Sequence, residues 1–531
     1  MKRTLALLLA CVLCVCCLAG CGGGSDSAAN GSETARSGGA AVLNIALDGE
    51  PGNLDCVMSS DDIISEVVYG SVFEKLVAFT AEDQVICELA ESYDVNEDHT
   101  VYTYHLRQGV RFHNGEEMTA DDVVASMNRW IDNADNANSL VGGAHFEKVD
   151  DATVQITMET GTLYLNEMIA GLGQQAAIMP ASVIEAAGEG DLVSEYIGTG
   201  PYAFDEWRAD QYIRLVANAG YQPYGEEGDY SGWGGHKTAY YDEVYFYFPG
   251  DTATVVDGIR TGEFDVANTL KGDDYPVFEG NDDYTIFSAE TELQMLIFNK
   301  SQGVGADPLV RQAVQAVINS NDLLYAAMGN EDFYKLYSSY MFQSSANWYT
   351  EAGGACYNQN DPDAARALFD QAGWTDDDVF RILVNSDATD YYAEAQVIQE
   401  ELRGIGINCE VLAYDSATYS TTRNTKPEAW DAFITGFGPK VLPNMNLFLS
   451  ASWAGWCDDA RIQSDLAAIA AESDLETARQ IWSDLQAYMY EEYVPVVKFG
   501  TTERSGVCTS EVEGVFMKER MVWVNAHPVS E

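Results

Sequence analysis

Histidine is scarce in this chain, with 6 residues among 531. None of them forms an H-E-x-x-H motif or a close pair at helical spacing, so the sequence does not predict a zinc hydrolase. The G-x-S-x-G turn that presents a nucleophilic serine is also absent. The 84 Asp and Glu residues leave a glycosidase pair of carboxylates open, but no motif singles one out. The sequence therefore gives little support to catalysis.

Basic residues are also few. Lys and Arg number 28 against 84 Asp and Glu, which gives a formal net charge of −56. Nucleic acids would repel such a chain, because phosphate binding requires Lys and Arg to displace counterions. We therefore expect no nucleic-acid partner. A well-solvated acidic surface is the simplest interpretation of the charge.

Long apolar runs are missing except near the N-terminus, where Lys2 and Arg3 precede the apolar stretch 5–18. Leu18-Ala19-Gly20-Cys21 resembles a bacterial lipobox, which predicts a lipoprotein signal peptide at 1–20 and lipidation of Cys21. A plain secretory signal and an uncleaved anchor are the alternatives. Residues 21–41 are rich in Gly, Ser and Ala and predict a flexible tether, with a reach of roughly 25 Å. Nothing later in the sequence is long and apolar enough to span a bilayer.

Cysteines are widely spaced in the remainder of the chain, which argues against a metal cluster. An oxidising exterior is compatible with one or more disulfides, but the pairing does not follow from the sequence. Small buried thiols are the alternative. We expect neither a metal nor a cofactor. The six residues concerned are Cys56, Cys87, Cys356, Cys409, Cys457 and Cys508.

The segment 89–130 has the most informative pattern. Residues 101–106 alternate as a half-buried strand does, Gly109 interrupts them, and 110–112 predict its resumption. Thr119 then has the character of an N-cap for a helix that would bury Val123, Met127 and Trp130. Apolar residues at helical spacing also predict a helix between residues 63 and 77.

Several motifs of the chain carry a family resemblance. The first is LAESY…YTYHLRQGVRFHNGE…TADDVVASMNR, from residue 89 onward. The second is GTGPY at 198–202, and the third joins FN at 298–299 to a helix at 307–318. Together they resemble the extracellular solute-binding proteins of family 5, the binding proteins of peptide, nickel and related ABC importers. The resemblance covers about residues 43–515.

This resemblance implies an α/β, two-lobed periplasmic-binding-protein-like fold of type II, with a ligand cleft between lobes that close by a hinge motion. One discontinuous lobe would comprise 42–60, 186–289 and 504–531, with a small extra domain at 61–185. The second lobe would span 290–503. The implied function is capture of a peptide-like or other small solute without catalysis, by a monomer anchored outside the cytoplasm. The implied partners are ABC permease subunits and their ATPases. An extracellular hydrolase and a sensory or chaperone-like lipoprotein on the same scaffold are the alternatives.

The resemblance also implies candidate ligand-binding residues. Peptide-binding relatives place an aromatic wall and an aspartate for the ligand's α-amino group in the loop that corresponds to 436–449. Here Phe437 supplies the wall, but this loop has no Asp or Glu, and Lys440 stands near the aspartate's place. We therefore expect ordinary peptides with a free amino terminus to bind poorly, and ligands that are neutral or anionic at that end, such as N-blocked peptides, carboxylates or chelated metals, to be preferred. The full set of candidates is Phe437, Gly438, Lys440, Arg423, Asn385, Tyr391, Trp453 and Trp456.

Overall fold

The computed structural model describes residues 40–59 and 61–529. The predicted signal peptide, Cys21 and most of the predicted tether therefore lie outside the described residues. Residues from Ala41 onward belong to one compact unit. In the described ranges, no helix combines the length and the apolar character that crossing a membrane requires.

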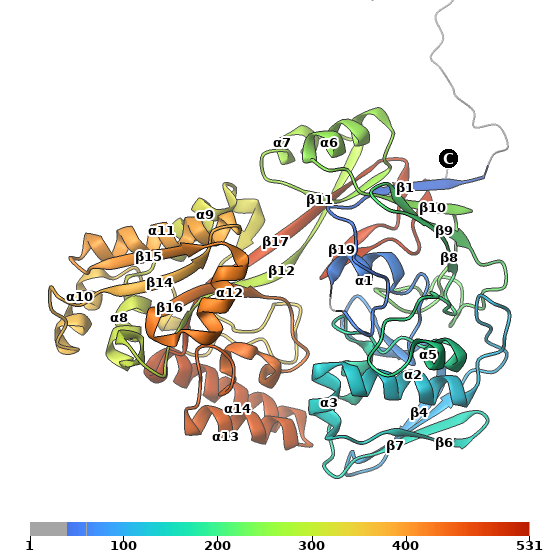
Figure 1. Ribbon diagram of the computed structural model, residues 1–531, viewed down its shortest axis with the longest axis horizontal. Helices are drawn as coiled ribbons and strands as arrows, with labels where there is room; N and C mark the ends of the chain where they lie inside the picture. Colours follow the sequence, from blue (N-terminus) through green and yellow to red (C-terminus); the bar gives the residue numbers. More distant parts are fainter. Residues whose placement is uncertain (1–39, 60, 530–531) are drawn as a thin grey trace, which may run out of the picture. The chain divides into compact units, whose positions relative to one another are not determined.

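An 11-stranded mixed sheet forms the framework (Figure 1). Its two longest strands, β12 and β17, are antiparallel and pair along most of their length. Short β13 (Tyr334–Lys335) pairs with β17 beside the main path. In spatial order, the strands of the main path are β15 (Cys409–Tyr414), β14 (Phe380–Asn385), β16 (Ala432–Phe437), β12 (Tyr284–Phe298), β17 (Val496–Thr509), β11 (Val266–Leu270), β1 (Val42–Ala46), β10 (Glu243–Tyr247), β9 (Tyr212–Ala217) and β8 (Tyr202–Arg208).

The pairing of β12 with β17 is irregular at two places. Glu290 pairs with Glu503, and the register shifts before Glu292 pairs with Thr502; a second shift lies between Gln294 and Met295. A shift of this kind locally bends and twists paired strands. The lobe boundaries predicted from the sequence, at 289/290 and 503/504, fall within these two strands, and they stay a prediction.

Smaller sheets accompany the large one. A four-stranded antiparallel sheet consists of β4 (Ala90–Val95), β5 (Val101–Leu106), β7 (Thr153–Thr157) and β6 (Phe146–Asp150). Three two-stranded antiparallel sheets are β2 (Val77–Phe79) with β3 (Val85–Cys87), β19 (Phe516–Lys518) with β20 (Arg520–Val522), and β18 (Val512–Glu513) with β21 (His527–Pro528).

The helices alternate with these strands, as an α/β fold requires. They are α1 (Asp62–Val68), α2 (Ala120–Asn133), α3 (Asp135–Val141), α4 (Leu165–Ala170), α5 (Ala181–Ala187), α6 (Thr252–Thr261), α7 (Tyr275–Phe278), α8 (Pro308–Val317), α9 (Ser320–Met328), α10 (Pro362–Gln371), α11 (Thr389–Gly404), α12 (Ser416–Thr425), α13 (Ala460–Ala471) and α14 (Leu475–Tyr488).

The segment with the most informative sequence pattern forms largely as expected. Strand β5 occupies residues 101–106. Helix α2 begins after Thr119, whose hydroxyl accepts the Asp122 N–H while the Asp122 carboxylate accepts the Thr119 N–H. This reciprocal capping satisfies two backbone donors that a helix start leaves free. Val123, Met127 and Trp130 are buried, as predicted.

Two local expectations are wrong. Residues 110–112 do not resume the strand, and only an isolated bridge joins Arg111 to Glu117. The helix expected between 63 and 77 ends at Val68, because Tyr69 is extended and Gly70 adopts a φ of 70°. The apolar residues beyond it are buried in irregular backbone, so their spacing reflects burial rather than a helix.

A buried ion pair joins the N-terminal segment to α2. Arg129 donates to both oxygens of Asp55, at 3.0 and 2.5 Å. Asp55 also accepts the backbone N–H of Val193 at 2.9 Å. The side chains of Arg129 and Asp55 are 6% and 0% exposed. Three stretches distant in sequence are therefore tied together at one carboxylate.

The six cysteines that the structure describes are all free thiols. Cys56, Cys409, Cys457 and Cys508 are buried, and Cys87 and Cys356 are half-buried. This arrangement matches the alternative of small buried thiols and not the disulfides that the exterior location allows. Within the described ranges, no three His, Cys, Asp or Glu side chains are grouped so that they could hold a metal ion.

Candidate functional site

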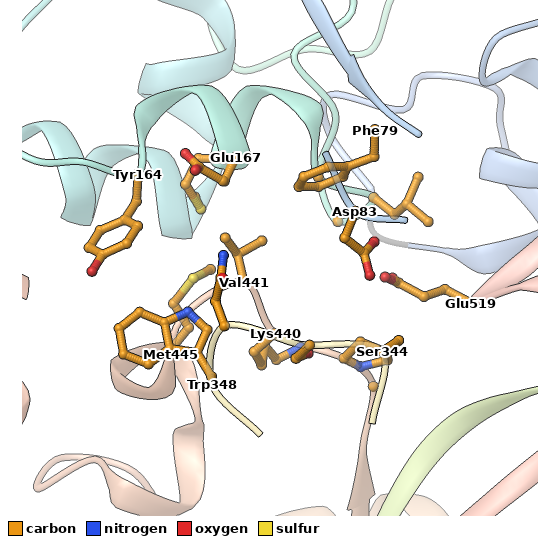
Figure 2. A pocket seen from close by; sticks show the side chains of 18 of the residues that line it. Phe79, Asp83, Tyr164, Glu167, Ser344, Trp348, Lys440, Val441, Met445 and Glu519 are labelled. Atoms are coloured by element: carbon orange, nitrogen blue, oxygen red, sulfur yellow. The ribbon is translucent and has the colours of Figure 1, made fainter. Parts of the chain in front are cut away.

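A pocket of about 680 Å³ lies where several separate parts of the chain meet (Figure 2). Residues of the hairpin β2–β3 and of the region around α4 form one side. The segment 344–348 and the loop that follows β16 form the opposite side, and the turn between β19 and β20 closes one end. Its volume falls in the range of small-molecule sites.

One wall of this pocket is aromatic and apolar. Tyr164, at the start of α4, packs against Trp348, with 5.9 Å between ring centroids. Phe79, Val441 and Met445 also line the pocket. Such surfaces hold the apolar part of a ligand, while a few polar groups set its orientation.

Two carboxylates face each other at one end of the pocket. Asp83 and Glu519 point toward one another in Figure 2. Each occupies the turn of a hairpin and has left-handed backbone, with φ of 58° and 54°. Lys518 pairs with Asp83 at 2.6 Å. Two hairpins thus bring acidic side chains from opposite ends of the sequence to one place.

The charges at this end balance one another in part. Burial raises the pKa of Glu519, and the neighbouring Asp83 raises it further. The positive charges of Arg520, Lys518 and Lys440 act in the opposite direction. Lys440 therefore belongs to a group of mixed charge, rather than standing alone in an apolar cleft.

A third carboxylate, Glu167, lies on the wall formed by α4. Its Oε2 atom is buried and has no hydrogen-bond partner within the described part of the chain. Burial raises the pKa of Glu167 to about 6. The hydroxyl of nearby Tyr164 is likewise buried without a partner. Unsatisfied buried polar atoms are uncommon in proteins, and they mark places where a ligand or water completes the structure.

A second pocket, of about 630 Å³, adjoins the first. Met168 and Met445 line both pockets. Its other walls include α13, the turn at 159–162 and the residues around Leu447. The flexible methionine side chains between the two spaces fit irregular shapes readily. A ligand longer than the first pocket has room to extend in this direction.

The structure separates the predicted site residues. Gly438 and Lys440 line the first pocket, and the other six candidates do not. Arg423 lies on α12, with its guanidinium 5.1 Å from the ring centroid of Trp453. Phe437 packs against the same Trp453 ring at 5.6 Å. Trp453 therefore brings Arg423 and Phe437 together in an aromatic cluster outside the pocket.

The remaining candidates have structural partners. Trp456 stacks on Trp430, with 5.7 Å between centroids. The Asn385 amide donates to the hydroxyl of Ser416 at 3.0 Å, which joins the end of β14 to the start of α12. Among the described residues, neither Asn385 nor Trp456 lines the pocket. Their proposed role in ligand binding stays a prediction.

Tyr391 belongs to an acidic network that the sequence did not indicate. Its hydroxyl donates to Glu292 at 2.6 Å, and Gln294 donates to Glu292 and to Asp390 at 3.1 Å each. Glu394 lies beside this network, fully buried, with neither carboxyl oxygen hydrogen-bonded among the described residues. Burial first, and the charges of Asp390 and Glu292 after it, raise the pKa of Glu394 well above its ordinary value.

Sequence reasoning missed most of the pocket. Glu167, Tyr164 and Trp348 are not among the candidates that the sequence singled out. The one available signal is that Glu167 is the only charged residue in the run LYLNEMIAGL, at 163–172. Asp83 and Glu519 have no local signal, because only the tertiary fold brings their hairpins together.

A recessed pocket with mixed charges, an aromatic wall and unsatisfied polar atoms defines a protein that binds a small solute. The profile of the "Bacterial extracellular solute-binding proteins, family 5 Middle" matches residues 84–456. The chain belongs to this family of bacterial extracellular solute-binding proteins, and the predicted resemblance is confirmed.

Relatives in sequence carry binding-protein names. A probable peptide ABC transporter periplasmic-binding protein of Sinorhizobium fredii is 25% identical over 460 residues, covering 82% of this chain and 84% of that protein. The glutathione-binding protein GsiB of Pectobacterium atrosepticum is 25% identical over 80% of this chain and 82% of that protein. The predicted class of function, a solute-binding protein of the kind that serves ABC importers, is confirmed.

Solved structures share the fold. A putative peptide-binding protein AppA from Clostridium difficile has a TM-score of 0.76 at 20% identity, covering 92% of this chain and 100% of that chain. NikA from Brucella suis, in complex with Fe(III)-EDTA, has a TM-score of 0.77 at 20% identity, with coverage of 92% and 100%. The predicted fold class, a two-lobed α/β periplasmic-binding-protein fold, is confirmed.

Proposed function

We propose that this chain captures a small zwitterionic, peptide-sized solute outside the cytoplasm and delivers it to an ABC permease. The observation that carries the proposal is the charge of the pocket, which holds Glu167 on the α4 wall and, at one end, a mixed group of Lys440, Arg520, Asp83 and Glu519. A ligand with both an amine and a carboxylate matches this distribution. The names of the relatives, which refer to peptides and to glutathione, support the same class of ligand.

Binding occurs without turnover of the ligand in this proposal. The relatives carry names of binding proteins, which supports this part of the proposal. Incubation of the purified protein with a panel of short peptides should leave every peptide intact. Cleavage that copurifies with the protein would overturn this part of the proposal.

The proposal includes a lipid anchor on Cys21 and a monomeric protein that works beside the membrane. The tether of 21–41 would let the folded unit reach permease subunits, whose cytoplasmic ATPases drive transport. The lipobox resemblance supports the anchor. The family's extracellular location supports the same side of the membrane.

Native mass spectrometry tests the proposed ligand class directly. Protein purified from its natural host without refolding should carry a bound solute, whose mass identifies it. The charge-reversed variant Lys440→Glu should carry less of it, whereas the matched variant Lys148→Glu, remote from the pocket lining, should carry as much. A bound solute that lacks either charge would contradict the proposed class.

A further inference from the structure

We infer that Glu167 and Tyr164 form the acceptor for a positively charged nitrogen of the ligand, which binds with its anionic end toward Lys440. This inference rests on the proposed function and specifies its orientation. It places cation recognition on α4, opposite the loop after β16. Figure 2 shows Glu167 and Tyr164 on one side of the pocket and Trp348, Val441 and Lys440 on the other.

Four carboxylates line the pocket, and three of them have a partner or are exposed. Asp83 is paired with Lys518 at 2.6 Å. Glu519 lies under the influence of Arg520, Lys518 and Lys440. Glu82 is exposed and accepts the Ser231 hydroxyl at 3.3 Å.

Glu167 differs from these three residues. No cation of the described residues offsets its charge, and one carboxyl oxygen lacks a hydrogen-bond partner. A buried carboxylate without a counter-charge is costly, and a ligand that supplies the cation removes this cost. Glu167 is therefore the carboxylate of the pocket most in need of a cationic partner.

The surroundings of Glu167 also favour a donor nitrogen of the ligand. Tyr164 is 4% exposed, and its hydroxyl has no hydrogen-bond partner among the described residues. The carboxylate of Glu167 is close enough to add to burial in raising the pKa of Tyr164 to about 12. A donor nitrogen placed between the two groups would satisfy both of them.

The aromatic residues favour the same occupant. The Trp348 ring lies 5.9 Å from that of Tyr164 on the facing side of the pocket. Ring faces attract cations, and indole does so most strongly. A carboxylate, a hydroxyl and two aromatic rings together recognise an ammonium or guanidinium group better than a neutral or anionic one.

The position of Lys440 determines which end of the ligand faces the loop after β16. Lys440 lies with two further cations, Arg520 and Lys518, beside the carboxylates of Glu519 and Asp83. An ammonium group bound there would meet more like charge than opposite charge, so the cationic end of the ligand is disfavoured there. The carboxylate end is favoured there for the same reason. The absence of an acidic residue from the loop 436–449 therefore reverses the orientation in which the ligand binds, and it does not exclude amines from the pocket.

Isothermal titration with three related probes tests this inference. The probes are tri-alanine, N-acetyl-tri-alanine and tri-alanine amide, measured at pH 7.5, where Glu167 is ionised. Wild-type protein should bind tri-alanine at least tenfold more tightly than its acetylated form. Glu167→Gln should weaken tri-alanine by about 10- to 100-fold, the loss expected for a charged hydrogen bond, and leave the acetylated peptide unchanged.

Controls separate recognition from a structural effect. Glu185→Gln, which alters an exposed carboxylate on α5 outside the pocket lining, should not change the preference. Tyr164→Phe should reduce it less than Glu167→Gln does. Lowering the pH from 7.5 to 5 should reduce the preference in wild type by up to about tenfold, because burial raises the pKa of Glu167 to about 6, and should not affect Glu167→Gln.

The outcomes also distinguish the two proposals. Equal binding of the free and acetylated peptides, or a preference that survives Glu167→Gln, would overturn the role of Glu167 and leave the proposed function standing. Failure of wild-type protein to bind any of the three probes would overturn both.

Discussion

Replacement of Arg129 by Met should strongly destabilise the folded chain. Arg129 makes two hydrogen bonds to Asp55 in a place where both side chains are almost fully buried. Without the guanidinium, the Asp55 carboxylate keeps only the backbone N–H groups of Val193 and Val57, at 2.9 and 3.3 Å. Two neutral donors do not compensate a buried negative charge.

The expected size of this effect follows from measurements on other buried pairs. Removal of one partner costs about 3–5 kcal/mol, because the other charge stays buried. For a unit that spans residues 41–531, the entropy of unfolding is about 1 kcal/mol per kelvin by the usual scaling with length. The melting temperature should therefore fall by about 3–5 °C if the unit unfolds in one transition.

Differential scanning calorimetry measures this shift. Arg479→Met is the matched control, because Arg479 pairs with Glu476 at 2.8 Å while their side chains are 41% and 80% exposed. Exposed pairs contribute about 0–1 kcal/mol, so the control should melt close to wild type. Adding Asp55→Asn to Arg129→Met should restore part of the loss. For a unit of this length, a shift of about 1 °C corresponds to about 1 kcal/mol. An Arg129→Met protein that melts within about 1 °C of wild type would therefore refute this reasoning.

Three further predictions concern other sites. Lys237 is buried between Glu74 and Glu88. Lys237→Met should destabilise the chain by about 3–5 kcal/mol in the same calorimetric assay. Unchanged stability would mean that the two carboxyls share a proton. Glu394 has a raised pKa in the folded state, so its stabilising contribution is present below pH 4.5 and is lost as pH rises. Glu394→Gln should therefore be more stable than wild type, by a margin that is larger at pH 8 than at pH 5; a constant margin in thermal unfolding would contradict the buried acid. Cys21→Ser should move the protein from the membrane fraction to the soluble fraction, and its retention in the membrane would indicate an uncleaved anchor.

Local sequence signals predicted the elements whose determinants are themselves local. Helix α2 has a reciprocal cap at Thr119 and a regular apolar face, and both are visible in the sequence. The helix expected over 63–77 shows the limit of such signals. Beyond Val68 the apolar spacing continues, but Gly70 turns the chain, and the apolar residues are buried because the whole segment lies in the core. Periodicity alone does not separate these two causes of burial.

Part of the pocket followed from the family resemblance, since Gly438 and Lys440 belong to one loop whose place in the fold the motifs define. The other walls have a different origin. Trp348 comes from a loop between strands, and Asp83 and Glu519 are separated by most of the chain, so their meeting depends on the pairing of distant segments. No pattern within a short window contains that information.

The acidic composition of the chain also hides its informative residues. With 84 Asp and Glu residues, a carboxylate in the sequence carries little meaning by itself. Glu167 becomes informative only when its surroundings are known, because burial, a missing hydrogen bond and the absence of a described cation distinguish it from the solvated majority. The loop 436–449 shows the converse case, in which the lack of any acidic residue was visible at once in so acidic a chain. That absence predicted poor binding of free amines, but the prediction considered only one wall of the pocket. The opposite wall carries Glu167, so in the orientation that we infer an amine binds beside Glu167 and a carboxylate binds beside Lys440, and the two walls together would orient a zwitterionic ligand.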